Sequence, residues 1–135
     1  MNSEFLLRKS VASSLFLLGA IAFLFTAVPQ TEATEVYVGQ WNNRKYNTKG
    51  TMTATLTKGQ GNSWSGVFTG MAIGKNYRFT ATFTERMHQG KRMLQGNSRI
   101  DGSMYKWAAY IVGSNLSGSY RAANGNNGNF SGRKR

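Results

Sequence analysis

The segment GTMTATLT, residues 50–57, has the clearest structural pattern in the chain. Met52, Ala54 and Leu56 alternate with threonines, so one side of this segment is apolar and the other is polar. Strict alternation with many β-branched residues is typical of a β-strand that has one buried face and one face in water. We therefore expect a strand here rather than a helix.

The same alternation recurs along the rest of the chain. The positions predicted to share the apolar face are Trp64, Gly66, Phe68, Tyr77, Phe79, Ala81, Phe83, Leu94, Gly96, Ser98, Ile100, Tyr105, Trp107, Ala109, Ile111, Leu116, Gly118, Tyr120, Phe130 and Gly132. With residues 36–41 these segments make about eight strands of about seven residues each. Turn signals lie between them at residues 59–62, 101–102, 113–114 and 124–128. Such short connections leave no room for crossover helices, so neighbouring strands should pair antiparallel.

The predicted fold class is therefore all-β, a single antiparallel meander that closes, or nearly closes, into a small β-barrel. Closure removes the exposed edges of such a meander most simply. A strongly bent open sheet is the alternative. An outer-membrane barrel is less favoured because strands of about seven residues are too short to cross lipid.

A short pattern of an apolar residue, a spacer and a glycine occurs four times. Its glycines are Gly66, Gly96, Gly118 and Gly132. We interpret them as structural corners, or alternatively as positions that leave space for a ligand.

A short motif near the start of this region resembles known small barrels. The segment from Gly39 through Trp41 to Asn43, followed by strands of the Trp64-x-Gly66-x-Phe68 kind, is similar to barrels of the avidin and lipocalin (calycin-like) type. The resemblance covers this motif and the topology, and it implies a small secreted up-and-down barrel. It does not extend to the serine that holds biotin in avidins, so we do not carry that ligand over.

Residues 1–33 have the pattern of an export signal. Arg8 and Lys9 precede an uncharged apolar run over residues 11–28, and Pro29 and the small Ala33 follow it. We expect cleavage after Ala33 and a secreted or periplasmic domain over residues 34–135. The alternative is an uncleaved N-terminal anchor in the inner membrane, which would be the only contact with a membrane.

The amino-acid composition excludes several kinds of structural and catalytic site. The chain has 135 residues, 17 Lys or Arg, 5 Asp or Glu, and no Cys, which gives a net charge of +12 and enough length for one domain. The absence of cysteine excludes a disulfide framework, a thiolate metal site and a cysteine nucleophile.

Catalytic groups are scarce in the predicted domain. Its acids are Glu35, Glu85 and Asp101, and its one histidine, His88, lies in a stretch over residues 85–92 that we predict to be a solvated polar loop. Glycoside hydrolysis needs two facing carboxyl groups, and metal or triad chemistry needs convergent partners. We therefore expect no enzyme, no catalytic residues, no metal and no cofactor.

The excess of basic residues suggests a first binding hypothesis. If the rings face inward, four cations on consecutive strands face outward and form a stripe, which the C-terminal residues extend. This predicted site comprises Arg78, Arg99, Lys106, Arg121, Arg133, Lys134 and Arg135. A surface of one charge attracts polyanions, so the predicted partner is an anionic polysaccharide, a lipid headgroup or another extracellular polyanion. The alternative is a basic surface that only keeps the protein soluble.

The aromatic residues suggest the other hypotheses. Trp41, Trp64, Tyr77, Trp107 and Tyr120 are assigned to the inward face, where they either fill the core or line a cup for a small apolar ligand. Ala108, Tyr110 and Val112 make the opposite face of their strand apolar as well. That face predicts self-association through the strand that contains Tyr110, as in a structural or interaction protein.

Overall fold

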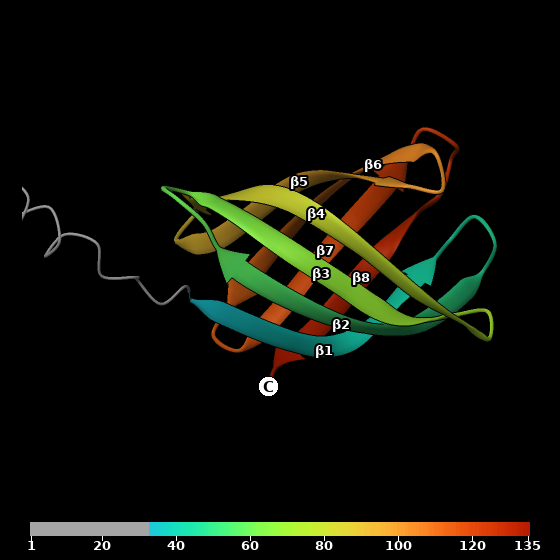
Figure 1. The fold of residues 1–135 in the computed structure, drawn as a ribbon, viewed down its shortest axis with the longest axis horizontal. Coiled ribbons are helices and arrows are strands. Elements are labelled where there is room, and N and C mark those ends of the chain that lie inside the picture. Colours follow the sequence, from blue (N-terminus) through green and yellow to red (C-terminus); the bar gives the residue numbers. More distant parts are fainter. Residues whose placement is uncertain (1–32) are drawn as a thin grey trace, which may run out of the picture. The chain divides into compact units, whose positions relative to one another are not determined.

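A computed structural model describes residues 33–135, which form an eight-stranded antiparallel barrel (Figure 1). The strands are β1 (Thr34–Asn43), β2 (Thr48–Lys58), β3 (Ser63–Ala72), β4 (Lys75–His88), β5 (Lys91–Ile100), β6 (Ser103–Val112), β7 (Asn115–Ala122) and β8 (Asn127–Lys134). Each strand pairs with the next one, and β8 pairs with β1 from Trp41↔Phe130 to Tyr37↔Lys134. The predicted closed meander is confirmed. The predicted export signal lies outside the described residues except for Ala33.

The turns have the geometry that tight hairpins require. Asp101 and Gly102 both have positive φ, 48° and 79°, which confirms the turn expected at this pair and gives it the geometry of a two-residue hairpin. Ile73-Gly74 and Gln89-Gly90 have the same geometry, with φ of 51° and 72° and of 52° and 74°. The right-handed twist of such turns suits neighbouring strands that coil around a barrel.

The strands are longer than predicted, with 8 to 14 residues in place of about seven. The largest difference is at residues 85–92, which do not form the predicted polar loop, because β4 continues to His88 and β5 begins at Lys91. Polar residues on both faces near the end of this hairpin hide the alternation in the sequence. Their inward members, Glu85 and Arg92, are polar because they bond to each other inside the barrel.

The predicted alternation places apolar side chains inside the bore and polar side chains outside it. Tyr37, Ala54, Leu56, Leu94 and Ala109 have side chains that are at most 2% exposed. Side chains on the other face of the same strands, such as the threonines of β2, reach solvent. The core is thus a single apolar column inside one closed sheet.

Three glycines of the predicted repeats make room for rings inside the bore. A Cβ atom on Gly96 would lie 2.7 Å from the Trp107 ring, and one on Gly66 would lie 2.9 Å from the Phe68 ring. A Cβ atom on Gly118 would overlap the Phe130 ring. These contacts confirm that the glycines have a structural role, because no side chain fits where the rings pack.

Candidate functional site

The two ends of the barrel differ in what fills them. We call the end with the turns at residues 59–62, 89–90 and 113–114 the network end. The end with the turns at residues 44–47, 73–74, 101–102 and 123–126 is the cup end.

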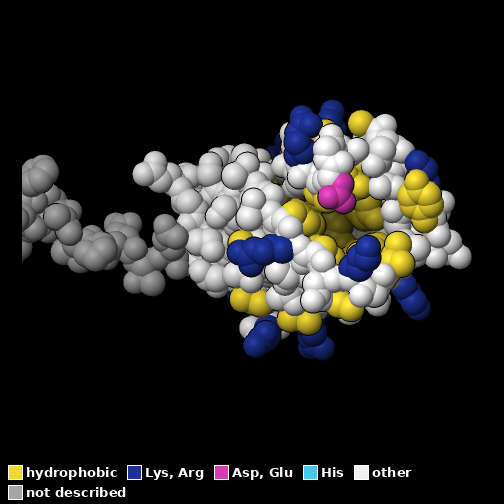
Figure 2. Space-filling view, turned by 45° about the vertical axis from the view of Figure 1, so that its right-hand side comes forward, with side chains coloured by type: hydrophobic (Ala, Val, Ile, Leu, Met, Phe, Trp, Pro, Cys, Tyr) yellow, Lys and Arg dark blue, Asp and Glu magenta, His cyan; other side chains and the backbone are white. Residues whose placement is uncertain are grey.

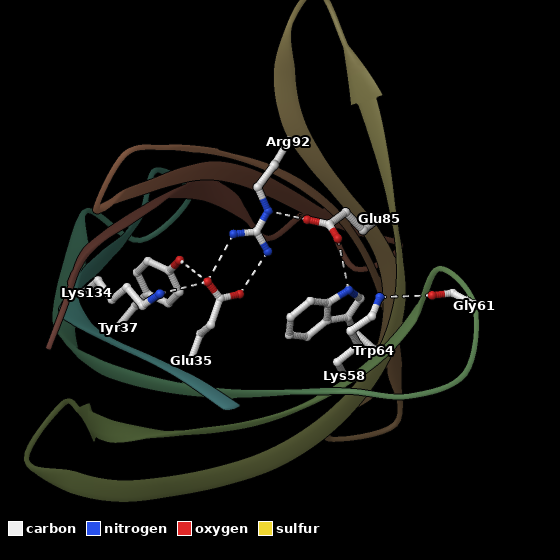
Figure 3. Close-up of polar contacts among 8 residues, drawn as sticks. All are labelled: Glu35, Tyr37, Lys58, Gly61, Trp64, Glu85, Arg92 and Lys134. Atoms are coloured by element: carbon white, nitrogen blue, oxygen red, sulfur yellow. Dashed lines mark hydrogen bonds and ion pairs between the residues drawn. The ribbon is translucent and has the colours of Figure 1, made fainter. Parts of the chain in front are cut away.

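At the network end, Arg92 of β5 reaches across the bore to β1, a strand that is not its neighbour (Figure 3). Its Nη1 and Nη2 atoms donate to the two carboxylate oxygens of Glu35 at 3.0 and 2.8 Å, and its Nε atom donates to Glu85. Lys134 adds a bond of 3.1 Å to Glu35, and the Trp64 Nε1 atom donates to Glu85 at 3.3 Å. Together these bonds link five of the eight strands across the network end.

The ion pairs shift the pKa values of their members. The pKa of Glu35 falls from 4.5 to about 2, chiefly because Arg92 donates hydrogen bonds to its carboxylate, and Lys134 acts in the same direction. Glu35 in turn raises the pKa of Arg92. Burial raises the pKa of Tyr37, whose hydroxyl lies 3.3 Å from Glu35. The carboxylate of Glu35 and the guanidinium of Arg92 are therefore both charged at neutral pH.

At the cup end, the bore opens into a cavity of about 610 Å³. Figure 2 shows a hollow with hydrophobic side chains inside it and with Lys and Arg side chains around it. The cavity is lined by eight aromatic side chains, which are Trp41, Phe68, Tyr77, Phe79, Tyr105, Trp107, Tyr120 and Phe130. All of them except Phe68 are only partly buried, so their rings remain accessible. We refer to this cavity as the cup.

Ring contacts hold Trp107 near the inner limit of the cup. Its ring centroid lies 5.1 Å from Phe83, 6.0 Å from Phe68 and 6.3 Å from Phe130, each in an edge-to-face arrangement. Its Nε1 atom donates to the buried Ser98 hydroxyl at 3.2 Å. Such contacts from several strands fix the position of the ring.

The polar atoms of the other rings differ in their partners. The hydroxyl of Tyr77 donates to the Thr51 carbonyl at 2.8 Å, and that of Tyr120 donates to the Asn42 carbonyl at 2.6 Å. Burial raises the pKa of both tyrosines to about 12, so both are neutral at pH 7. The Nε1 atom of Trp41 is buried and has no acceptor within residues 33–135.

The wall of the barrel is incomplete beside the cup. β4 and β5 pair from Thr82↔Asn97 to His88↔Lys91, and the pairing stops there. No pairs form between the preceding part of β4, residues 75–81, and the last residues of β5, 98–100. Residues of both segments line the cup, and we call the unpaired stretch between these two segments the slot.

The structure separates the predicted interior residues into two groups. Trp41, Tyr77, Trp107 and Tyr120 line the cup together. Trp64 lies at the network end instead, where it is 5% exposed and the Arg92 guanidinium lies 5.7 Å from its ring centroid. Alternation places all five side chains inside, but it does not say at which end of the bore each one lies.

The predicted basic residues do not form one stripe. Arg78, Arg99, Lys106 and Arg121 are exposed near the cup end, and Lys106 pairs directly with Arg121 across β6 and β7. The C-terminal cations, Arg133, Lys134 and Arg135, lie at the network end, because β8 ends there. Lys134 shares the inward face with Phe130, and its Nζ atom binds Glu35, so it is no part of an outer surface.

The outer face around Tyr110 is partly covered by its own neighbours. The Tyr110 hydroxyl lies 3.0 Å from Nδ1 of His88, and Met93, between their strands, is only 5% exposed. His88 is therefore a partly buried strand residue and not the solvated loop residue predicted. Val112 remains 53% exposed on the same face.

Several cup residues were not identified from the sequence as site residues. Three of them, Lys75, Asn76 and Asp101, lie in or next to the turns at the mouth of the cup. Only the strand register shows that these turns meet at the same end of the barrel. The inward position of Glu35 and Arg92 could have been found, since each lies two residues from a core residue, Tyr37 and Leu94.

Within the described residues no cluster of His, Asp and Glu side chains is suited to a metal ion. The same residues contain no helix long and apolar enough to cross a membrane.

The sequence matches no protein family and no curated protein. A de novo designed fluorescence-activating β-barrel is among the solved structures with a similar fold. It aligns with a TM-score of 0.58 at 9% sequence identity, over 74% of this chain and 91% of the designed chain. The likeness shows the fold, and it agrees with the small up-and-down barrel that the avidin and lipocalin resemblance implies.

The network end predicts a defined response to acid. Because the pKa of Glu35 is lowered to about 2, its contribution to stability is complete above its unfolded value of 4.5 and is lost as the pH falls from 4.5 toward 2. Glu35→Gln should destabilise the protein by about 1 to 3 kcal/mol at pH 7 and should flatten the acid limb of a plot of melting temperature against pH. Asp101→Asn is the control, because it removes an exposed acid that has no ion pair among residues 33–135. An acid limb unchanged by Glu35→Gln would contradict this assignment.

Proposed function

We propose that this barrel is a non-catalytic binding module that holds a small molecule with an apolar, ring-containing body in its cup. The observation that carries the proposal is the open cavity of about 610 Å³ with its eight aromatic side chains. Small-molecule sites are typically concave, mostly apolar and about 300 to 1,000 Å³ in volume.

The accessibility of the rings supports this function over simple core filling. Side chains that only fill a core pack against each other and lose contact with solvent. Those of Tyr37, Leu56 and Leu94 do so, since they are at most 2% exposed. In contrast, Trp41, Tyr77 and Trp107 stay partly exposed although they point into the bore. Apolar surface kept open in a concave site is typical of a binding site.

Filling the cup should weaken binding strongly. Ala72 lines the cup at the end of β3 and is only partly buried, so Ala72→Trp places a ring where the ligand would lie. N-phenylnaphthylamine, a neutral dye whose fluorescence rises in apolar sites, should bind the native protein saturably. Its affinity should fall by about tenfold or more in Ala72→Trp, which corresponds to roughly 1.4 kcal/mol.

Two further variants keep this test decisive. Ala123→Trp, at an exposed position of the β7–β8 turn, adds the same side chain outside the cup and should leave the affinity unchanged. Ala72→Met fills less of the space and should give an intermediate affinity if the larger ring disturbs folding. Equal dye binding by the native protein and by both Ala72 variants, or no binding by the native protein, would overturn the proposal.

A second candidate function, binding of a polyanion on the outer wall, rests on four cations near the cup end. Arg78, Arg99, Lys106 and Arg121 are exposed, and none of them belongs to an ion pair among residues 33–135. Free cations on adjacent strands attract sulfated or phosphorylated polymers and release their counterions.

Heparin chromatography tests this second function. Charge reversal of the four outer-wall cations to glutamate should lower the salt concentration at which the protein elutes several-fold. The matched control is charge reversal of four exposed cations at the network end, Lys58, Arg86, Lys91 and Arg133, which changes the net charge equally. If both variants elute at the same salt concentration, retention reflects net charge alone and the outer-wall site is rejected.

A further inference from the structure

We propose that the ligand of the cup is a small organic acid, whose anionic group binds at Lys75 and Arg78 while its ring-containing body lies among the aromatic side chains. This inference rests on the proposed function of the cup and names the class of its ligand. The outer-wall polyanion function shares Arg78 with this site, but it also needs Arg99, Lys106 and Arg121, which lie outside the cup.

The first argument is the position of these two cations. Both line the cup, although they lie on opposite faces of β4 by strand alternation. This is possible because β4 has no partner on its β5 side along residues 75–81, so side chains from both of its faces reach the slot. Neither cation is in an ion pair within the described residues. One edge of the slot therefore presents two unneutralised positive charges to a ligand.

The second argument is the distribution of charge between the ends. Glu35 and Glu85 lie at the network end and are bound by Arg92 and Lys134. Asp101 is thus the one acid at the cup end in residues 33–135, whereas many cations lie on the turns and adjoining strands of that end. Those outside the cup are Arg44, Lys45, Lys49, Arg99, Lys106 and Arg121. A cleft whose edge carries a large excess of one charge sign concentrates ligands of the opposite sign.

The third argument is the arrangement of apolar and charged surface within one cavity. The rings of Tyr77 and Phe79, whose centroids lie 6.0 Å apart, follow Lys75 on the same inward face of β4. A molecule that stacks on these rings would therefore carry its charged end to the rim of the cup. A neutral apolar ligand would leave the two cations without a partner and gain nothing from them.

Asp101 opposes an anion and sets its orientation. It lies on the β5–β6 turn across the slot from β4, so its carboxylate repels a bound acid and favours the β4 side. Asn tolerates the positive φ of 48° at this position, so Asp101→Asn removes the charge while it keeps the turn. This substitution should raise the affinity for an anion.

The test compares two dyes that share a ring system. Anilinonaphthalene sulfonate is an anion, and N-phenylnaphthylamine is its neutral counterpart. Lys75→Gln combined with Arg78→Gln should weaken sulfonate binding by about threefold to tenfold, as expected for two partly exposed ion pairs, and should change binding of the neutral dye by less than about twofold. Asp101→Asn should strengthen sulfonate binding by about twofold to threefold.

The matched control is Lys106→Gln combined with Arg121→Gln, which removes the same charge from the outer wall near the cup end. It should leave sulfonate binding within about twofold of the native value. An equal loss in both double variants, or equal effects on both dyes, would overturn the inference while the neutral dye still binds the cup. Failure of the native protein to bind either dye would instead overturn the proposed function.

Discussion

The ion pairs of Arg92 occupy one end of the bore, and the open cavity lies at the other end. This side chain crosses the bore from β5 to β1, and it binds Glu35 with both terminal nitrogens. Its neighbours Glu85, Trp64 and Lys134 complete the bonds inside the network end. Since these groups occupy one end of the bore, the free volume lies at the other end, beside the slot between β4 and β5.

The barrel has no cysteine, so packing and hydrogen bonds stabilise it without any covalent link. The aromatic side chains at the two ends of the barrel differ in how deeply they are buried. Trp64 stacks on Phe83, with ring centroids 6.3 Å apart, and is buried under Arg92, so it contributes to stability. Trp41 and Trp107 remain partly exposed and form the cup. A cup held by a rigid sheet loses little entropy when a ligand binds, because its walls are already ordered.

The fold could be predicted almost completely from the sequence, whereas the site could be predicted only in part, since four of the five interior residues expected from alternation line the cup. Alternation in β2 and the turn at Asp101 predict strands and hairpins because both depend on neighbouring residues. Strand register and the ends of the bore depend on pairs far apart in the chain. The sequence therefore could not distinguish buried Trp64 from Trp41 in the cup, nor show that Lys134 turns inward to Glu35. The polar stretch at residues 85–92 misled the prediction because buried ion pairs look like loop residues in a sequence.

The three tryptophan indole N–H groups offer the most direct measurement of the central claim, that the cup binds a ligand. Trp41 and Trp107 line the cup, and Trp64 lies at the network end as an internal reference. In proton–nitrogen correlation spectra recorded during titration with N-phenylnaphthylamine, the Trp41 and Trp107 indole signals should shift saturably while the Trp64 signal stays in place. Shifts of all three signals to the same extent, or a shift of the Trp64 signal alone, would contradict binding in the cup.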